Sequence, residues 1–470
     1  MDEDNPALIL ILLVFLSFFF LDFSLEAYKR ITFPYQLDYP EGYVLYFSSS
    51  LSKAENIYKD INEEPFALVL YTPFFFFLSS IFIKLFGLSF LWGRLISFSF
   101  SLLSLSIIFK FTYRKGSRFI TFVLLALFIS DPTLFPFLTL NRVDITALAF
   151  SLLGLFLFLK RFHYLSIPFF LLSLFTKQTF LAIPLACIIY KIISEGKKGL
   201  KFLLIFLSSI VPSLLFINYL SENRFLYHML IANYGMALEY DPIIYLNNLL
   251  TFVRNNIFTF GIALFYSVMR IKRKRLKPLP LALLISLFVT FITGARIGAI
   301  QNHFMELAAL SIIITGVFIS RVRSLRRLLS LLLVIQLAVN FPLYSLTYPS
   351  TNFEELISIP YDSQYKVSKF LENFTGRIIS EDIGILVING KEPYILDLAG
   401  FTSFVTYSKL IDEGKVIKDI EDKKIPVIIL ENSLEDVVRL QRLTPSIAIA
   451  IAKNYYIYKY YPPYYILLPK

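Results

Sequence analysis

Two carboxylates stand close together near the start of the chain, in the stretch LDYPEGY at 37 to 43. Asp38 and Glu41 are three residues apart in a short polar loop that directly follows the first long apolar segment. A positioned carboxylate can take the proton from an attacking hydroxyl, and such general-base catalysis typically contributes about 10²–10⁴-fold to a rate. An ordinary solvated loop is the alternative, and the residues by themselves leave both interpretations open.

Other charged side chains interrupt the apolar runs or lie beside them, namely Arg94, Arg142, Asp144, Lys177, Arg296, His303 and Glu306. A charge near a membrane core costs about 3 kcal/mol unless it is paired or functional. Cations that share one site can hold a phosphate and stabilise the negative charge that grows on it when a bond breaks. We therefore predict a shared substrate-binding site made by these residues and Tyr71.

Structural roles compete with this prediction at several of the positions. Arg94 and Arg142 could mark membrane interfaces by snorkelling, and Lys177 could be a structural cation in its nearly uncharged surroundings. His303 and Glu306 share a helix face at a spacing of three and could bind a metal, but two ligands do not make a site. A hydrogen-bonded pair or a substrate contact is favoured there.

Composition places the chain among membrane proteins. Of 470 residues, 56% are hydrophobic and 17% are charged, against about 25% charged in soluble domains. The net charge of +11 comes from short Lys and Arg clusters between apolar runs, which is a topology signal and excludes nucleic acid as the expected partner. A single cysteine, Cys187, excludes an intrachain disulfide.

The elements that must position the charged residues are apolar helices, because about 20 apolar residues cross a bilayer core roughly 30 Å thick. We expect an α-helical polytopic membrane protein with about 11 transmembrane helices. The predicted spans lie near 7–25, 90–110, 118–138, 143–160, 164–176, 178–193, 200–220, 257–271, 279–295, 302–320 and 327–346.

Orientation follows from five basic clusters, around residues 110–118, 160–161, 191–201, 270–277 and 321–327, since two predicted spans separate each from the next. The positive-inside rule makes their side cytoplasmic. The N-terminus is then cytoplasmic, the C-terminus is external, and a multi-pass plasma-membrane protein results. Segment 66–86 leaves an alternative open. If it spans the membrane, the Asp38 loop is cytoplasmic, and if it lies in the outer leaflet, that loop is external.

Two domains are expected. Residues 1–347 would form the transmembrane domain, with external loops at 26–89 and 221–256, the second holding a helix or two. Residues 348–470 would form a small external α/β domain, because short strand-like segments at 385–388 and 425–430 alternate with polar helical stretches.

The motifs together resemble the GT-C superfamily of membrane glycosyltransferases, in the branch of protein O-mannosyltransferases and aminoarabinose transferases. The resemblance rests on the acidic motif, Tyr71 with Pro73, the apolar segment 74–86, Gly87, Arg94, and the stretches RVDITALAF (142–150), TKQTFLAIP (176–184) and QNHFMELAA (301–309). The last 95 residues are similar to the tail domain often found in this branch. This branch often has adjacent acids where Asp38 and Glu41 stand apart.

The resemblance implies a polyprenyl- or dolichyl-phosphate sugar donor, a protein, lipid or glycan acceptor, surrounding membrane lipids, and transfer on the external side with inversion. It makes Asp38 the candidate catalytic base, while Glu41 would orient it, bind the acceptor, or share a divalent metal with it. The metal ligands stay unassigned. The competing hypothesis is a transporter or flippase for a polar or lipid-linked substrate, which predicts internal repeats and a site near the midplane. Because no repeat is visible and the charges gather at one face, the enzyme is favoured.

Overall fold

The computed structural model describes residues 6–113, 118–237, 240–296, 299–322, 324–346 and 353–470. The chain forms two compact units. Unit 1 comprises Met1–Ile31, Arg94–Ser213 and Asp241–Pro349, and unit 2 comprises Thr32–Gly93, Leu214–Tyr240 and Ser350–Lys470. The unit that holds the C-terminal residues therefore also contains the stretch with Asp38 and Glu41.

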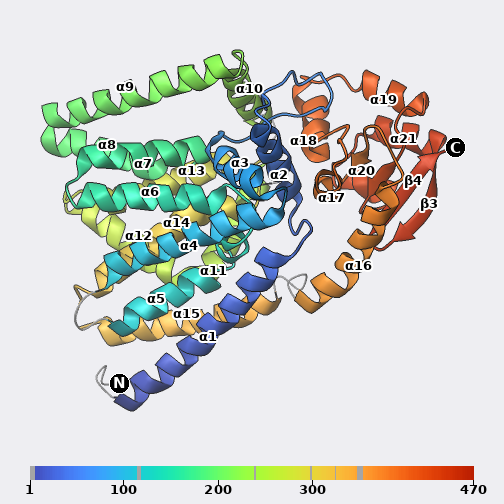
Figure 1. The fold of residues 1–470 in the computed structure, drawn as a ribbon. Coiled ribbons are helices and arrows are strands. Elements are labelled where there is room, and N and C mark those ends of the chain that lie inside the picture. The colour runs from blue at the N-terminus through green and yellow to red at the C-terminus, as the bar shows by residue number, and fades with distance from the viewer. Residues whose placement is uncertain (1–5, 114–117, 238–239, 297–298, 323, 347–352) are drawn as a thin grey trace. The chain divides into compact units, whose positions relative to one another are not determined.

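Unit 1 is a bundle of apolar helices joined by short loops (Figure 1). Its helices are α1 (Pro6–Thr32), α4 (Phe90–Thr112), α5 (Arg118–Ser130), η1 (Phe135–Leu138), α6 (Asp144–Leu159), α7 (His163–Thr176), α8 (Ala182–Glu195), α9 (Lys197–Leu220), α11 (Pro242–Asn255), α12 (Ile257–Lys272), α13 (Pro278–Thr293), η2 (Gln301–Phe304), α14 (Met305–Ile319) and α15 (Arg326–Leu346), of which α1, α4 and α9 run on into unit 2. Helices thus occupy each of the ranges that the sequence predicts as spans.

The most buried helix of unit 1 is α14, which packs against α5, α12 and α13. Between Glu306 and Arg321 it carries no charged residue, and a helix that is apolar all round belongs in the interior. Of its most apolar window, taken with η2, 89% is buried, against 11% for α9. Helix α9 therefore offers most of its apolar surface to the surroundings, as a lipid-facing helix does.

Membrane-spanning length is reached by fewer helices than the predicted number of about 11. Within the described ranges, three segments are long and apolar enough on their own: Phe90–Thr112, Lys197–Leu220 and Gln301–Ile319. Helices α11 and α12 qualify together but bend by 99° at the break between them. Five further apolar helices, among them α6, α7 and α13, are shorter, so the full count stays a prediction.

The bend between α11 and α12 is stabilised by Gln336 of α15. Its Oε1 accepts hydrogen bonds from the backbone nitrogens of Phe258 and Thr259, both at 3.0 Å, and its Nε2 donates to the oxygen of Asn255 at 3.2 Å. Backbone groups that a break releases inside an apolar region must be satisfied by the protein. A buried glutamine in the apolar α15 meets this need.

Unit 2 combines a four-stranded sheet with helices (Figure 1). The order is β1-β2-β4-β3, with β1 and β2 parallel and the other pairs antiparallel. The strands are β1 (Ile379–Ser380), β2 (Ile428–Leu430), β3 (Tyr455–Tyr461) and β4 (Tyr464–Pro469), and the helices are α2 (Tyr39–Ser52), α3 (Phe74–Phe86), α10 (Phe225–Ala237), α16 (Phe353–Leu371), α17 (Ile383–Ile388), α18 (Leu398–Ser403), η4 (Phe404–Ser408), α19 (Gly414–Glu421), α20 (Leu434–Arg439) and α21 (Pro445–Asn454).

Both faces of the sheet are covered. Ile428 and Leu430 contribute to one apolar cluster, whereas Val427 and Ile429 contribute to another. This alternation is the period of two expected when successive strand side chains point to opposite faces. The strand predicted at 425–430 is therefore confirmed, with its regular part at Ile428–Leu430.

The strand predicted at 385–388 is wrong, because these residues belong to helix α17. Asp382 caps the helix through a hydrogen bond from the Ile385 nitrogen to its Oδ1 at 2.9 Å. A side-chain acceptor at the N-cap satisfies an otherwise unpaired amide and favours helix over strand. A four-residue apolar run does not reveal this difference by itself.

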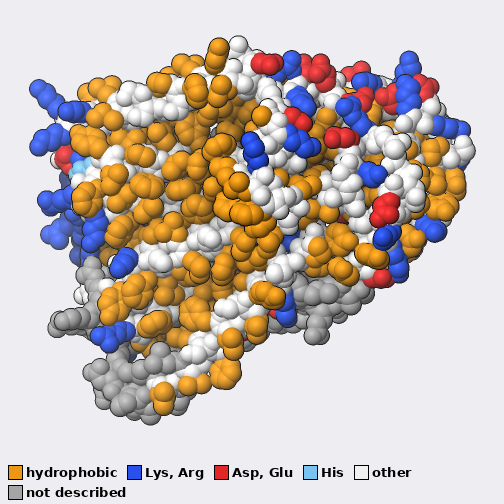
Figure 2. Space-filling view, viewed as in Figure 1, with side chains coloured by type: hydrophobic (Ala, Val, Ile, Leu, Met, Phe, Trp, Pro, Cys, Tyr) orange, Lys and Arg blue, Asp and Glu red, His pale blue; other side chains and the backbone are white. Residues whose placement is uncertain are grey.

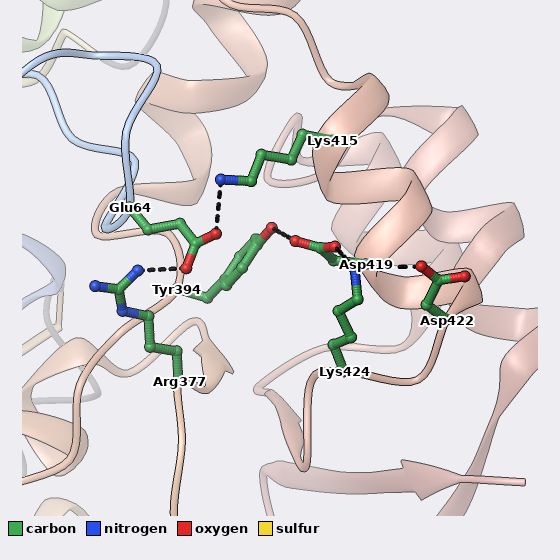
Figure 3. A network of polar contacts seen from close by, with 7 residues as sticks. All are labelled: Glu64, Arg377, Tyr394, Lys415, Asp419, Asp422 and Lys424. Atoms are coloured by element: carbon green, nitrogen blue, oxygen red, sulfur yellow. Dashed lines mark hydrogen bonds and ion pairs between the residues drawn. The ribbon is translucent and has the colours of Figure 1, made fainter.

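The stretch between α2 and α3 joins the C-terminal part of unit 2 as an added strand-like segment. Phe66 pairs with Ile395, and its nitrogen donates to the oxygen of Tyr394 at 3.0 Å. Beside it, Glu64 forms ion pairs with Arg377 and with Lys415, the latter at 2.9 Å (Figure 3). The segment is thus held by backbone pairing, by burial of the Phe66 ring and by charge.

The same network continues into the helical side of the domain. The Tyr394 hydroxyl donates to Asp419 at 2.7 Å, and Lys424 bridges Asp419 at 2.7 Å and Asp422 at 3.2 Å (Figure 3). Most of these groups are partly exposed, so each pair contributes modestly to stability, at roughly 0.2–1 kcal/mol. Their joint effect is to fix where the loop from 53 to 73 joins the sheet domain.

Candidate functional site

The core of the candidate site in unit 1 is Asp144, the first residue of α6. Its carboxylate accepts from Lys177 Nζ at 2.5 Å, Arg142 Nε at 3.0 Å and Asn302 Nδ2 at 3.0 Å. All four side chains are buried, with at most 5% of any residue exposed. Three of the charged residues predicted from the sequence therefore meet in one place.

Local structure explains how residues so far apart in sequence converge. Arg142 and Asp144 lie at the start of α6, Lys177 is the extended residue that ends α7, and Asn302 lies in η2 before α14. The Ser173 hydroxyl donates to the oxygen of Ala147 at 2.8 Å and fixes α7 against α6. The Asp144 group thus lies where the start of α6, the end of α7 and the turn before α14 meet.

Aromatic rings cover the two cations. The Arg142 guanidinium lies 4.9 Å from the ring centre of Phe137, and Lys177 Nζ lies 5.8 Å from that of Phe180. A cation over an aromatic face gains about 0.5–2 kcal/mol. The rings also exclude water, which strengthens every electrostatic interaction inside the site.

Arg94 is completely buried on α4. Its Nη1 donates to the backbone oxygen of Arg30 at 3.0 Å, and one turn further along α4 the Ser97 hydroxyl donates to the oxygen of Arg142 at 3.2 Å. Snorkelling of Arg94 towards an interface, the structural alternative raised by the sequence, does not occur. Arg94 ties α4 to α1, and Ser97 ties α4 to the Asp144 group.

Arg296 and His303 flank the segment before α14. Arg296 is half-buried, and its charge acts on the His303 ring together with those of Lys177 and Asp144. Within the described chain the buried Nδ1 of His303 has no hydrogen-bond partner. A buried ring nitrogen without a partner is costly unless another molecule supplies one, so His303 is a candidate contact for a ligand.

Glu306 has structural partners. Its carboxylate accepts from the Ser151 hydroxyl at 2.9 Å and from the Ile183 nitrogen at 3.3 Å. Ile183 lies in the first turn of α8, where a negative charge is favoured by unpaired amides and the helix dipole. Glu306 therefore links α14, α6 and α8, and these contacts favour a structural role over the predicted substrate contact.

The acidic pair of unit 2 is part of a helix start and not of an open loop, which corrects the sequence interpretation. Asp38 takes the N-cap position of α2 with extended backbone and makes no side-chain cap. Glu41, fully buried, accepts from the Leu37 nitrogen at 2.8 Å instead. The Glu41 carboxylate thus anchors the start of α2, whereas the Asp38 side chain does not cap this helix.

The position of α2 is fixed by a close helix contact. Gly42 lies against Gly384 of α17, and a Cβ at position 42 would fall within 2.9 Å of the Gly384 Cα and closer still to its nitrogen. The Gln36 side chain accepts from that nitrogen at 2.9 Å. In the same unit, the ring centre of Tyr71 lies 5.9 Å from that of Tyr43 in α2. Tyr71 is thus packed close to the helix that begins after Asp38.

Sequence reasoning missed two polar residues of unit 1. Asn302 carries no charge, although its place before an apolar run next to His303 was a usable signal. Asp131 is buried and accepts from the Thr133 nitrogen at 2.8 Å and from Asn256 Nδ2 at 3.3 Å. The turn sequence SDPT around it resembles an ordinary loop, which is why it gave no functional signal.

Two crystal structures of ArnT from Cupriavidus metallidurans share the fold along their whole length. The apo form is 12% identical, with 97% of this chain and 98% of that chain covered and a TM-score of 0.60. The form bound to undecaprenyl phosphate is 13% identical, with 96% and 97% covered and a TM-score of 0.58. This chain has the GT-C fold.

A third GT-C structure, the oligosaccharyltransferase of Archaeoglobus fulgidus in complex with Zn and sulfate, is 14% identical with a TM-score of 0.50 and covers 92% of this chain and 71% of that chain. No family model matches the sequence, and no curated protein matches it significantly. The GT-C assignment of the fold therefore rests on structural similarity. It agrees with the resemblance that the sequence motifs indicate.

A divalent metal would need several oxygen, nitrogen or sulfur ligands close together. In the ranges that the structure describes, no three His, Cys, Asp or Glu side chains gather closely enough to bind one. Asp144 already contacts two cationic side chains, and a divalent ion at that carboxylate would meet their repulsion. The unit 1 group is therefore unsuited to a metal.

Proposed function

We propose that this protein is an integral-membrane glycosyltransferase that moves a sugar from a polyprenyl or dolichyl phosphate to an acceptor on the extracytoplasmic side. The observation that carries the proposal is the buried Asp144 group with its two cations, in a GT-C fold that one neighbour presents with undecaprenyl phosphate bound. The acceptor class is a protein, a lipid or a glycan.

In this proposal the cations of unit 1 bind the donor phosphate. Lys177 and Arg142 are held in place by Asp144, so little side-chain entropy is lost when the phosphate arrives. Arg296 and the His303 ring extend the same region. Each charge-assisted contact contributes about 1.5–3 kcal/mol, and the attraction grows as the departing phosphate gains charge, which favours the transition state over the bound donor.

Asp38 is the proposed catalytic base. The acceptor oxygen attacks the anomeric carbon, the bond from that carbon to the phosphate oxygen breaks, and the lipid phosphate leaves with the bonding electrons. Asp38 takes the hydroxyl proton. Attack opposite the departing phosphate inverts the anomeric centre. Glu41 supports this step indirectly, because its bond to the Leu37 nitrogen fixes the start of α2.

The proposed topology follows from the charge distribution of the sequence. The basic clusters lie in the cytoplasm together with the N-terminus. Residues 348–470 form an external domain, and residues 1–347 form the transmembrane domain. Segment 66–86, whose helix is α3, lies in the outer leaflet, so that Asp38 faces the external side.

Binding of the bare lipid phosphate tests the proposal first. Purified full-length protein is mixed with undecaprenyl phosphate, dolichyl phosphate or dolichol, and bound lipid is counted by native mass spectrometry. We expect both phosphates to bind and dolichol, which lacks the phosphate, to bind at least tenfold more weakly. Equal binding of dolichol and dolichyl phosphate would contradict a phosphate site.

Glycan analysis then tests the chemistry. Mass spectrometry of cell-surface glycans should reveal one sugar that is absent from cells without the protein and from cells that express Asp38→Asn. Proteoliposomes distinguish the competing hypothesis, because a transporter or flippase would move a lipid-linked sugar across the bilayer without transferring it. Transport with unchanged glycans would overturn the enzyme assignment.

A further inference from the structure

A second charged site lies in unit 1, where α4, α6 and α14 end and α13 begins. A cavity of about 420 Å³ opens there, and four cations share its lining with apolar side chains: Lys110, Lys160, Lys277 and Arg321. No described residue of the lining is Asp or Glu. Ligand-binding pockets commonly measure about 300–1,000 Å³, so the space is sufficient for a small charged group. We call it the basic crevice.

Aromatic side chains orient two of the four cations of the basic crevice. Lys160 follows the last residue of α6, and its Nζ lies 5.6 Å from the ring centre of Phe156. Arg321 donates from Nη1 to the Tyr266 hydroxyl at 2.7 Å. Both rings belong to the lining as well. All four cations are exposed, but Lys160 and Arg321 are each oriented by an aromatic side chain of the lining.

The partial charges of the nearby helix ends can be compared with the charge of the four cations, to see whether the cations merely neutralise the helix dipoles. The C-terminal ends of α4, α6 and α14 contribute roughly −0.5 elementary charge each, and the N-terminal end of α13 contributes roughly +0.5. Against these partial charges stand the four full charges of the lining. A net positive charge of roughly three remains, which is far more than the helix ends require.

The basic crevice is separate from the Asp144 group. Asp144 begins α6 and Lys160 follows its end, so the whole 16-residue helix separates the two sites. Its length corresponds to roughly 24 Å. The crevice belongs to the basic clusters that the sequence predicts to be cytoplasmic. Figure 2 shows Lys and Arg side chains gathered at the left edge of the molecule, where the orange apolar surface ends.

A neighbouring hollow extends the positive region. It measures about 440 Å³ and shares Lys277 with the basic crevice. It adds Arg270 from the last turn of α12, and Lys274 and Arg275 from the connection between α12 and α13. Its described lining likewise contains no carboxylate. A ligand at the crevice is therefore bordered by further positive charge on the α13 side.

We propose that the basic crevice binds the phosphodiester head group of an anionic phospholipid from the leaflet on this side of the membrane. The cations match the negative head group, and the apolar wall that includes Phe156 matches the upper part of the acyl chains. Basic pockets between transmembrane helices at the cytoplasmic side are suited to anionic head groups. The lipid would clamp the ends of α4, α6, α13 and α14 together.

The test uses full-length protein in detergent with phosphatidylglycerol or phosphatidylcholine, and native mass spectrometry counts the bound lipids. We expect wild-type protein to retain phosphatidylglycerol at least tenfold better. The double variant Lys160→Gln/Arg321→Gln should lose about 25-fold in phosphatidylglycerol affinity, at roughly fivefold for each charge. The control Lys198→Gln/Lys201→Gln removes the same charge from α9, outside the lining, and should change affinity less than threefold.

Several results would overturn the proposal: equal retention of the two lipids, an unchanged crevice variant, or an equal loss in the α9 control. Soluble glycerol phosphate is the third ligand, and displacement of phosphatidylglycerol by it at low millimolar concentration would assign the site to a free phosphate ester instead. If the crevice variant does not fold, salt decides the matter on wild-type protein. Raising ionic strength from 0.05 to 0.5 M should remove most of the preference for phosphatidylglycerol, and a salt-independent preference would refute it.

Discussion

Replacing Asp144 by Asn tests the structural logic of the proposed donor site. The carboxylate accepts from Lys177, Arg142 and Asn302 and is completely buried. Its removal deprives two buried cations of this partner, and breaking a buried ion pair in this way costs about 3–5 kcal/mol. We therefore expect Asp144→Asn to lower the free energy of unfolding by about this amount.

The matching change on the cation side should be milder. Lys177→Met retains the apolar part of the side chain and leaves Asp144 with Arg142 and Asn302 as donors. Each single variant loses the interaction between Lys177 and Asp144, and the double variant Asp144→Asn/Lys177→Met loses it only once. The losses in the free energy of unfolding should therefore not add. A double-mutant cycle should give a coupling energy of at least about 2 kcal/mol, within the 0.5–3 kcal/mol seen for contacting pairs.

The chain supplies its own reporter for this measurement. Cys187 is the only cysteine, it is completely buried, and it lies in α8 of unit 1. A thiol-reactive dye that fluoresces on labelling therefore follows the thermal unfolding of this unit. As a control, Glu26→Gln breaks the more exposed pair with Lys29 on α1 and should cost less than about 1 kcal/mol.

Ligand binding then separates the two roles. Asp144→Asn that still folds at low temperature keeps both cations and should lose less affinity for dolichyl phosphate than Lys177→Met. The Lys177→Met variant should lose roughly tenfold or more, the equivalent of a charge-assisted contact of about 1.5–3 kcal/mol. The reasoning would be refuted if Cys187 in Asp144→Asn reacted with the dye at the same unfolding temperature as in wild type. It would also be refuted if Lys177→Met bound dolichyl phosphate as tightly as wild type does.

Three further predictions concern unit 2. Asp38→Asn should lower sugar transfer by about 10²–10⁴-fold while dolichyl phosphate still binds, and normal turnover would make Glu41 the next candidate. In a Cys187→Ser background, single cysteines at Ser52 and Ser433 should both label from outside the cell, and opposite accessibility would mean that 66–86 spans the membrane. Burial and the charges of neighbouring carboxylates raise the pKa of Glu431 from 4.5 to about 8. The folded state then binds a proton that the unfolded state releases, so the stability of the C-terminal domain should fall as pH rises from about 4.5 to about 8. Hydrogen exchange of its peptides should record this fall, Glu431→Gln should flatten it, and an unchanged slope in that variant would contradict the assignment.

The helices of this protein could largely be predicted from its sequence, because apolar runs of this length have few other structures available in a membrane. Their interruptions could not. The bend between α11 and α12 depends on Gln336, which lies some 80 residues further along the chain. The helix α17 was mistaken for a strand because its cap, Asp382, outweighs the propensity of four apolar residues.

The candidate site was predicted in part for a similar reason. Full charges inside apolar runs are rare, so the sequence alone indicates Arg142, Asp144 and Lys177 as candidate site residues. It does not show that they contact one another. Asn302 carries no charge and was missed. Glu306 carried a strong signal but bonds to Ser151 and to the start of α8, and such partners are known only once the chain has folded. Sequence indicates that a buried charge needs a partner, and only the fold tells which one.

The contact of α2 with α17 has a consequence for how the protein is made. The Gln36 side chain bonds to the nitrogen of Gly384, 348 positions later in the chain, beside the Gly42 backbone. At a synthesis rate of about 5–20 residues per second, roughly 20–70 seconds pass between the two. During that time α2 can pack against α3, but the side of its start that Gly384 covers has no partner. The stretch around Asp38 therefore reaches its final packing only after the apolar helices of unit 1 have been synthesised, and the pace of translation sets how long it waits.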